Sequence, residues 1–294
     1  MPCPICGAHT RRVFAKDGYP IHECIACHHR HVPLPPRTNH IAAVYGDHYF
    51  QARSGQGSAG YPDYLAEADL LQAHGWRYAE LLQRFMPLGT VLDVGAAAGF
   101  VLQGLVERGW RGVGLEPNGT MSAYGRTQLG LTMVTGALED AQIVKNASNG
   151  SFDLVTMIQV IAHFQDLHRA LTHAANLTRD GGFWLIESWD RTSWPAWLLG
   201  RYWHEYSPPS VLHWFSPAGV AELTSQLGFV EVARGRPQKR LKGAHAKSLL
   251  RYKLQGLPLA TRLALPFALI PDRLTLPYPN FDLFWILLQK KPSV

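Results

Sequence analysis

From residue 88 onward the sequence alternates short apolar runs with segments of helical character, and this alternation constrains the fold more than any other feature. Strands are predicted over residues 90–94, 112–116, 132–135, 152–157, 183–187, 229–233 and 283–289. Helices are predicted over 99–108, 120–129 and 166–177, and from the Ser216-Pro217 helix start to Gly228. Strands separated by helices of about 10–15 residues predict an α/β fold with a mostly parallel, doubly wound sheet.

Ligands of such sheets bind at the carboxyl ends of the strands. The first predicted strand runs there into Asp93-Val-Gly-Ala-Ala-Ala-Gly99. A dinucleotide loop needs glycines because the pyrophosphate lies almost on the backbone, and Ala97 would crowd it. A ligand without phosphate tolerates alanine better. Glu116 ends the second predicted strand, seventeen residues beyond Gly99, where its carboxylate can accept hydrogen bonds from both hydroxyls of a ribose. Asp93 is placed to hold a cationic or amino group.

These residues carry a specific family resemblance. Asp93–Gly99 resembles the D-x-G-x-G-x-G loop of class I S-adenosylmethionine-dependent methyltransferases, with Ala97 in place of the middle glycine. Further segments resemble the family in its usual order: 115–118, 135–140, 152–163, 180–187 and 213–217. The resemblance covers about residues 40–235, and the cysteine-rich N-terminus is similar to a bacterial branch of the superfamily. It implies a seven-stranded Rossmann-like methyltransferase sheet and S-adenosylmethionine as cofactor.

The resemblance also implies which residues serve the cofactor and the reaction. The expected cofactor-binding residues are Asp93, Gly95, Ala97, Gly99, Glu116, Pro117, Ala137, Leu138 and Gln159. His163 and His213 occupy positions that match the family and are the candidate acid–base residues, although histidine often serves structural hydrogen bonds as well. Glu187 and His204 are further residues near the expected acceptor position.

All four cysteines lie within the first 27 residues, spaced C-x2-C-x17-C-x2-C: Cys3, Cys6, Cys24 and Cys27. This spacing is typical of a tetrahedral structural zinc site, in which two tight turns each supply two thiolates. Disulfides are the alternative, which a cytoplasmic chain disfavours. We expect most of the neighbouring histidines to be solvated loop residues: His22, His28, His29 and His31. A zinc-binding ribbon with a structural role is therefore predicted over residues 1–36.

The rest of the chain is predicted to form three further parts. Residues 37–85 would supply a tyrosine-rich lid, with Tyr45–Tyr64 folding over the cofactor, and a lead-in helix. Residues 86–235 would form the methyltransferase core, including an aromatic cap over 188–216. The cap has two open interpretations, a core of its own or a wall of the substrate site. Residues 236–294 would form a basic, apolar helical insert and the final strand.

The positive charge of the chain is concentrated in that insert. No acidic residue lies between Glu231 and Asp272, whereas nine basic residues do, without which the formal net charge of +6 would become −3. The segment either caps the sheet with its lysines in water or contacts anionic lipid or an anionic, lipid-linked substrate. The first residues contain no apolar run typical of a secretory signal, and no run of about 18–20 apolar residues follows, so neither a signal nor a membrane span is expected. A cytoplasmic location is expected, with peripheral contact with the inner face of the membrane as an extension of it.

The predicted function is S-adenosylmethionine-dependent methyl transfer, to oxygen in preference to nitrogen or carbon. The acceptor would be a small molecule, a sugar or a glycan or lipid-linked intermediate. One alternative is an RNA methyltransferase that uses the zinc module and the basic tail. The weakly basic ribbon and the sequence Met157-Ile-Gln-Val160, which is not a base-methylating Asn-Pro-Pro motif, disfavour nucleic acid. The other alternative is a non-catalytic zinc-binding interaction protein on the same fold.

Overall fold

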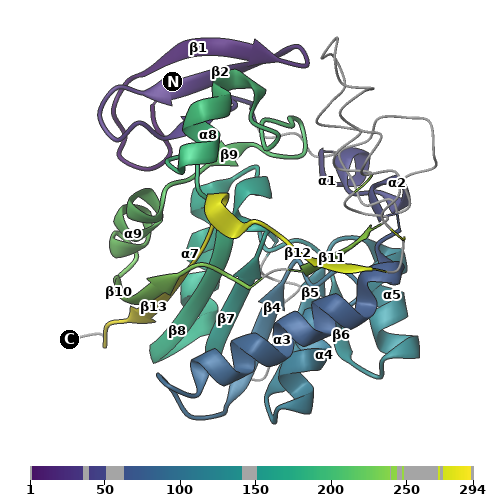
Figure 1. The fold of residues 1–294 in the computed structure, drawn as a ribbon. Helices are drawn as coiled ribbons and strands as arrows, with labels where there is room; N and C mark the ends of the chain where they lie inside the picture. Colours follow the sequence, from purple (N-terminus) through teal and green to yellow (C-terminus); the bar gives the residue numbers. More distant parts are fainter. Residues whose placement is uncertain are drawn as a thin grey trace.

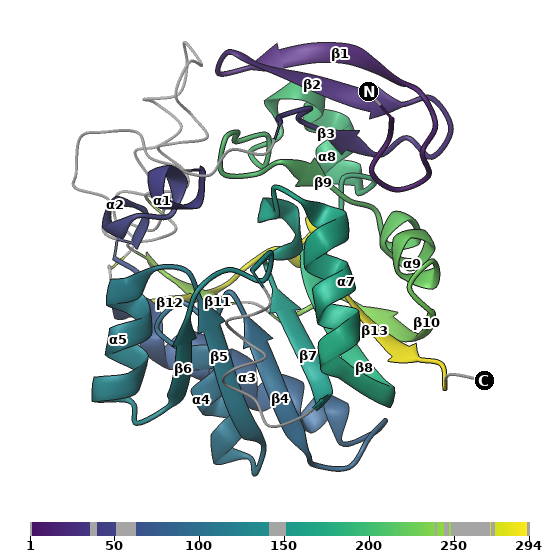
Figure 2. The same cartoon turned by 180° about the vertical axis from the view of Figure 1, so that it is seen from behind.

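The computed structural model describes residues 2–35, 40–50, 63–140, 151–238, 240–243, 247, 271 and 274–292. Its centre is a seven-stranded sheet of order β10-β13-β8-β7-β4-β5-β6 (Figures 1 and 2). The strands are β4 (Thr90–Val94), β5 (Arg111–Glu116), β6 (Thr132–Thr135), β7 (Phe152–Ile158), β8 (Thr178–Trp189), β10 (Phe229–Gly235) and β13 (Leu283–Lys290). The five strands from β8 to β6 are parallel, and β13 runs antiparallel to both β8 and β10. The predicted mostly parallel sheet is confirmed.

Helices cover both faces of this sheet, because alternate residues of each strand point to opposite sides. Val91, Leu154 and Leu185 face α3 (Ala68–Leu82) and α4 (Phe100–Glu107). Their neighbours in the strands face α7 (Leu167–Leu177) and α9 (Pro217–Ser225). The helix α5 (Gly119–Gln128) follows β5 and contacts β6. Where α3 crosses α4, a Cβ on Gly75 would lie 2.2 Å from the Val101 carbonyl oxygen, so only glycine permits this approach.

The N-terminal strands form a separate sheet with a strand from the core. Its order is β1 (Thr10–Lys16), β2 (Tyr19–Cys24), β3 (Arg30–His31) and β9 (His213–Trp214). The strand β9 belongs to the chain after β8, and it pairs antiparallel with β3. The ribbon therefore lies above the carboxyl ends of the parallel strands and is joined to the core by backbone hydrogen bonds (Figures 1 and 2).

Short elements complete the cover at this end of the molecule (Figure 1). They are α1 (His40–Val44), α2 (Asp47–Phe50), η1 (Leu65–Glu67), η2 (Ile161–His163), α8 (Trp194–Leu199), η3 (Gly200–Tyr202), β11 (Arg240–Lys242), β12 (Thr275–Pro277) and η4 (Asn280–Asp282). Within the part that the structure describes, no helix is long and apolar enough to cross a membrane.

Several predictions fall wholly or partly outside the described residues. Within the predicted helical insert, Arg240–Lys242 and Thr275–Pro277 pair as the strands β11 and β12, whereas Gly243 and Lys247 are helical. Residues 244–246 and 248–270 of that insert, which include Arg251, Lys253 and Arg262, lie outside the described residues. So do the lid glycines Gly55, Gly57 and Gly60. No feature of the structure tests the domain boundaries predicted from the sequence, so they stay predictions.

Candidate functional site

The loop after β4 keeps a glycine-type backbone although it carries an alanine. Gly95, Ala97 and Gly99 have φ angles of +68°, +50° and +91°, all in the left-handed region. A Cβ on Gly95 would lie only 2.0 Å from a methyl group of Val160. A side chain in this conformation costs about 1–2 kcal/mol, so the conformation at Ala97 must be held by its surroundings.

Glu116, at the end of β5, stabilises this conformation of Ala97. Its side chain is buried, and its Oε2 accepts a hydrogen bond from the Ala97 N–H at 2.8 Å. Its Oε1 accepts one from the Asn118 N–H, also at 2.8 Å. Burial raises the pKa of Glu116 to about 7, although these two N–H groups oppose the shift. Each carboxylate oxygen keeps a second lone pair, with which it can accept a further hydroxyl.

Asn118 links this loop to the N-terminal helices and was not among the predicted site residues. Its Oδ1 caps α5 by accepting from the Met121 N–H at 2.8 Å. Its Nδ2 donates to the Tyr45 carbonyl oxygen at 3.0 Å and to Asp47 Oδ1 at 3.1 Å. An asparagine directly after Glu116-Pro117, at the start of a predicted helix, is a recognisable N-cap signal. No such signal in the sequence predicts its contacts with Tyr45 and with Asp47 of α2.

Asp93 lies inside the sheet and not at an open surface. Its Oδ1 accepts a hydrogen bond from the Thr156 hydroxyl at 2.6 Å, which joins β4 to β7. Burial raises the pKa of Asp93 to about 7. The structure thus shows this carboxyl bracing two strands beneath the loop, and the contact with a cationic ligand stays a prediction.

The other predicted cofactor residues flank the loop on two sides. Pro117 stands between Glu116 and Asn118. Ala137 is half-buried and Leu138 is buried just after β6, where the Leu138 carbonyl oxygen accepts from His173 Nδ1 at 2.8 Å. The structure therefore brings the segments after β4, β5 and β6 to one edge of the sheet.

On the opposite side of the loop, Gln159 and Glu187 form a buried polar cluster. Gln159 has a φ of +59°, and its backbone N–H donates to the Glu187 carbonyl oxygen at 2.9 Å. Its Nε2 donates to Glu187 Oε1 at 2.8 Å. Glu187 Oε2 accepts from His74 Nε2 at 2.7 Å and from the Tyr78 hydroxyl. The Glu187 carboxylate is thus occupied in anchoring α3 to the ends of β7 and β8.

His163, the last residue of η2, lies near the same strand ends. Its Nδ1 is 2.6 Å from the Ser210 carbonyl oxygen and 3.0 Å from the Tyr45 hydroxyl, which also donates to that carbonyl at 2.5 Å. A ring that donates Nδ1–H to Ser210 carries its lone pair on Nε2. Burial lowers the pKa of His163, so the neutral ring is favoured.

His213 lies in a different environment, a stack of histidines between the ribbon and η2. Its ring is buried, with Nδ1 3.4 Å from His29 Nε2 and Nε2 3.1 Å from the Phe164 carbonyl oxygen. Burial lowers its pKa to about 3. The rings of His29 and His31 are also stacked, 5.9 Å apart, and both are buried. The expectation that most of these histidines are solvated was wrong for His29 and His31, which find their partners in β9 and in each other.

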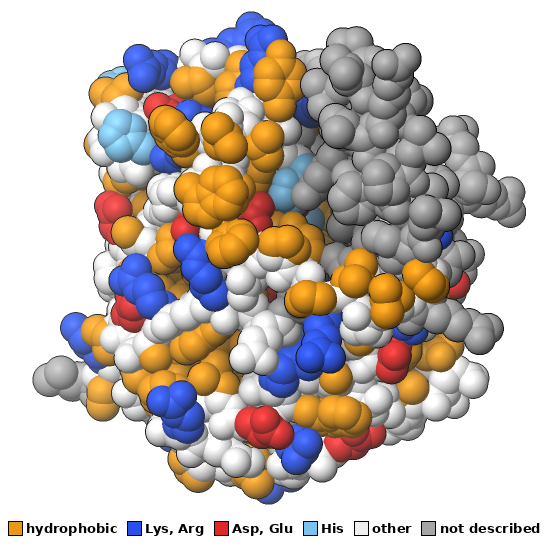
Figure 3. All heavy atoms as spheres, viewed as in Figure 1, with side chains coloured by type: hydrophobic (Ala, Val, Ile, Leu, Met, Phe, Trp, Pro, Cys, Tyr) orange, Lys and Arg blue, Asp and Glu red, His pale blue; other side chains and the backbone are white. Residues whose placement is uncertain are grey.

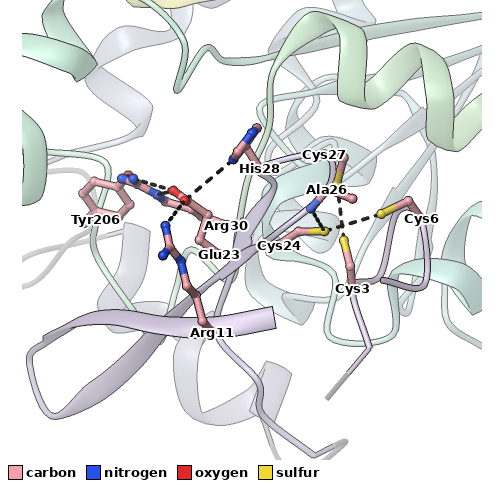
Figure 4. Close-up of polar contacts among 10 residues, drawn as sticks. All are labelled: Cys3, Cys6, Arg11, Glu23, Cys24, Ala26, Cys27, His28, Arg30 and Tyr206. Carbon is pink, nitrogen blue, oxygen red and sulfur yellow. Dashed lines mark hydrogen bonds and ion pairs between the residues drawn. The ribbon is translucent and has the colours of Figure 1, made fainter. Parts of the chain in front are cut away.

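The four cysteine side chains converge at one point of the ribbon (Figure 4). Cys3 and Cys27 have their Sγ atoms 3.6 Å apart, those of Cys6 and Cys24 are 3.5 Å apart, and all four lie within 4.8 Å of one another. The cysteines are not joined by disulfides. Zn–S bonds of about 2.3 Å in a tetrahedron place sulfurs just under 4 Å apart, so the group fits a metal ion. Among the described residues no histidine joins it.

An arginine that is ion-paired within the ribbon also donates a hydrogen bond to the aromatic cap (Figure 4). Arg30 donates from Nε to Glu23 Oε2 at 2.7 Å and from Nη1 to the Tyr206 hydroxyl at 2.7 Å. The ring of Phe14 packs edge-on against Tyr206, with centroids 5.0 Å apart. The ribbon is therefore docked by side chains as well as by the β3–β9 pairing.

The aromatic cap divides into two groups. The buried group belongs to the core: Trp203, Tyr206, Trp214 and Phe215. The exposed group consists of Trp194, Trp197 and Tyr202. Trp189, at the end of β8, is half-buried and lies 5.0 Å from the ring of His204 and 5.9 Å from that of Tyr278. The core interpretation thus holds for the buried group alone.

Comparison with known proteins identifies the family of the chain. A family model described as "Methyltransferase domain" matches residues 71–233. The chain is 29% identical over 148 residues to the ubiquinone biosynthesis O-methyltransferase of Paramagnetospirillum magneticum. That match covers 50% of this chain and 57% of the relative, so the chain spans little more than half the length of the curated relative.

Solved structures share the fold at low sequence identity. The magnesium protoporphyrin IX methyltransferase of Synechocystis PCC 6803, with bound S-adenosylhomocysteine, has a TM-score of 0.53 at 11% identity, over 85% of this chain and 100% of that one. The 1,6-didemethyltoxoflavin-N1-methyltransferase of Burkholderia thailandensis has a TM-score of 0.52 at 15% identity, over 91% and 98%. These similarities concern the fold alone.

Proposed function

Since the chain belongs to the methyltransferase domain family, whose model covers residues 71–233, we propose that it transfers the methyl group of S-adenosylmethionine to an acceptor at the carboxyl ends of β7 and β8. The proposal rests on one observation: the Gly95–Gly99 loop has a left-handed backbone that is held by the hydrogen bond from the Ala97 N–H to Glu116. The loop keeps the conformation of a glycine-rich loop through this contact, although Ala97 replaces a glycine. A relic without a ligand would have no need to retain so costly a backbone.

The residues around the loop suit the proposed cofactor. The free lone pairs of Glu116 accept the two ribose hydroxyls. Ala137 and Leu138 border the adenine from the end of β6, and Gly95 lets the Val160 side chain pack against the loop. Bound S-adenosylmethionine supplies a methyl group already activated by its sulfonium, so the protein has to align the acceptor and manage a proton.

The acceptor atom in this proposal is a hydroxyl oxygen, and His163 receives its proton. The curated relative that matches half of the chain is an O-methyltransferase by name. Burial keeps the pKa of His163 low, so the ring is neutral at pH 7, and the Ser210 carbonyl holds its Nδ1–H. His213 is not part of this proposal, because its ring nitrogens are engaged by His29 and by the Phe164 carbonyl oxygen.

The acceptor belongs to the class of hydroxylated small molecules and sugars. Trp189 and Tyr278 are half-buried aromatic rings beside the end of β8, and such rings stack on sugars and flat molecules. Glu187 takes no part in the chemistry, since His74, Tyr78 and Gln159 already occupy its carboxylate.

The four clustered cysteines hold one structural zinc ion in this proposal. The Ile5 and Ala26 N–H groups point at Cys3 Sγ and Cys24 Sγ, each at 3.4 Å, as expected for turns that support thiolate ligands. A site with four sulfur ligands leaves no open position, so the ion would stabilise the ribbon and take no part in methyl transfer. Metal analysis of the purified protein should find about one zinc per chain.

Calorimetric titration with S-adenosylhomocysteine is the first test of methyl transfer. Binding in the micromolar range, lost in Glu116→Ala and kept in the surface variant Glu80→Ala, would support the proposal. Absence of binding by a folded wild-type protein would refute it. His163→Gln should then lower kcat and remove the acidic limb of the pH–rate profile while leaving S-adenosylhomocysteine binding unchanged.

A further inference from the structure

We infer that α8 and the neighbouring η4 form a docking surface for an anionic lipid bilayer. Apolar side chains are exposed together on these elements, and we name them the α8 patch: Trp194, Trp197, Leu198, Leu199, Tyr202 and Phe281. The exposed fractions of Trp197, Tyr202 and Leu198 are 81%, 72% and 65%. Soluble proteins rarely leave large aromatic side chains exposed in a contiguous group unless the group binds something.

The sequence of α8 places these side chains on one face. Trp194, Trp197 and Leu198 stand at positions i, i+3 and i+4, which are neighbours on a helix, whereas Ala196 faces the protein and is buried. The ring of Trp194 lies 5.7 Å from that of Phe281, which joins α8 to η4. Figure 3 shows the hydrophobic side chains gathered over these two elements.

Buried hydrogen bonds anchor the segment that carries the exposed face. Trp203, directly after η3, is 1% exposed, and its Nε1 donates to Asp282 Oδ2 at 3.0 Å. The Nε1 of Trp214 donates to the Glu205 carbonyl oxygen at 2.7 Å. The same segment thus buries some tryptophans completely and presents others to the outside. Tryptophan and tyrosine are the residues that settle at the interface between lipid headgroups and acyl chains.

The charges around the patch favour an anionic surface. Arg201 is exposed, lies over the Tyr202 ring at 4.9 Å and donates to its hydroxyl at 2.7 Å. Arg236 is exposed and donates to the Asn280 carbonyl oxygen at 3.1 Å, beside Phe281. Segments 188–216 and 274–292, which the structure describes throughout, contain no exposed carboxylate. Basic residues around an apolar centre suit anionic headgroups, whereas a second copy would bring two positive rims together.

The position of the α8 patch would bring the acceptor end of the sheet close to the bilayer surface. The helix α8 follows β8 within a few residues of Trp189, so the α8 patch borders the end of the sheet where the acceptor is proposed to bind. A hydroxylated acceptor carried by a lipid would reach that end without leaving the bilayer surface. This consequence rests on the proposed methyl transfer, whereas the docking surface itself does not.

Vesicle sedimentation tests the inference with the whole chain. The probes are vesicles of phosphatidylcholine alone and of phosphatidylcholine with phosphatidylglycerol. Trp197→Asp and Leu198→Asp should each lower the partition coefficient on the anionic vesicles by about tenfold or more, because a charge replaces a large apolar side chain at the interface. Leu88→Asp is the matched control, since Leu88 is 49% exposed and precedes β4 at the opposite end of the sheet. Arg201→Glu should weaken binding to the anionic vesicles more than to the neutral ones.

The outcomes separate this inference from the proposed function. Failure of the wild type to sediment with anionic vesicles would overturn the inference, as would an equal loss in Leu88→Asp. A dimer in analytical ultracentrifugation that Trp197→Asp dissociates, without vesicle binding, would assign the α8 patch to a second copy and overturn it too. Titration with S-adenosylhomocysteine should give the wild-type Kd in every variant. A protein that binds vesicles but not S-adenosylhomocysteine would refute the methyl transfer and leave the docking surface standing.

Discussion

Replacing Glu116 by alanine is the perturbation whose effect the geometry defines best. The substitution removes the acceptor of two backbone N–H groups at 2.8 Å, those of Ala97 and Asn118, and the acceptor proposed for two ribose hydroxyls. A hydrogen bond to a charged group contributes about 1.5–3 kcal/mol. Loss of both ribose contacts would cost about 3–6 kcal/mol, which corresponds to a rise in Kd of about 10²–10⁴-fold.

Glu116→Gln is the sharper variant because it keeps the size of the side chain. Its carboxamide offers one oxygen to one of the two backbone N–H groups and turns an NH2 donor toward the other. Neither orientation satisfies both Ala97 and Asn118, so the left-handed turn at Ala97 loses its support or α5 loses its entry contact. We expect Glu116→Gln to raise the Kd by about tenfold or more.

The assay is calorimetric titration with S-adenosylhomocysteine at pH 8, alongside thermal unfolding. Glu80→Ala is the control, because the Glu80 side chain is 59% exposed and pairs with Arg108 at 3.4 Å. Both Glu116 variants should remain folded with a lowered Tm, since buried N–H groups lose their acceptors. A wild-type Kd in folded Glu116→Ala would refute the ribose-clamp assignment.

Further predictions concern the pH dependence of the two buried carboxyls, the backbone at Ala97 and the cysteine cluster. Burial raises the pKa values of Asp93 and Glu116 to about 7, so the free energy of unfolding of the free protein should fall as pH rises from about 4 to 7. Affinity for S-adenosylhomocysteine should increase over the same pH range, because Glu116 ionises. Unfolding experiments and calorimetry at pH 5.5 and 8 check the sign of both changes. Ala97→Gly should raise the Tm by about 2 °C without weakening the cofactor analogue, because relief of the left-handed methyl exceeds the added chain entropy; a lower Tm would contradict the strain argument. Cys24→Ser should lose the proposed zinc ion and lower the Tm while the Kd for S-adenosylhomocysteine stays unchanged; bound metal at the wild-type level would exclude Cys24 as a ligand.

The sheet and the cofactor end could be predicted from sequence because their signals are local. Alternating strands and helices set the order of β4 to β8, and parallel strands bring their carboxyl ends to one edge. Glu116 then lies beside the Gly95–Gly99 loop because β5 pairs with β4 in register. The four cysteines converge for a similar reason, since two tight turns of one short ribbon carry them.

The cover over the acceptor end could not be predicted, because it depends on pairings between distant segments. The strands β3 and β9 contain two residues each, too few for any periodicity, and His29 contacts His213 across 184 positions of sequence. Polar residues such as these look solvated in the sequence and are buried only when their distant partners are known. In the same way, the sequence gives no sign that Trp203 is buried while Trp197 is exposed, because that division depends on where η4 lies.

The long-range pairings also determine how far the loss of the proposed zinc ion should affect the structure. The Val32 N–H donates to the Leu212 carbonyl oxygen, and the Leu212 N–H donates to the Ala162 carbonyl oxygen, both at 2.9 Å. The ribbon is thereby connected through Leu212, directly before β9, to η2, which ends at His163, and to the chain around Ser210 that holds the His163 ring. The cofactor loop follows β4 and is held by Glu116, and neither of these two backbone hydrogen bonds involves it. A chain without its metal should therefore keep its affinity for the cofactor while His163 loses its fixed position, so the acceptor reaction should fail before cofactor binding does.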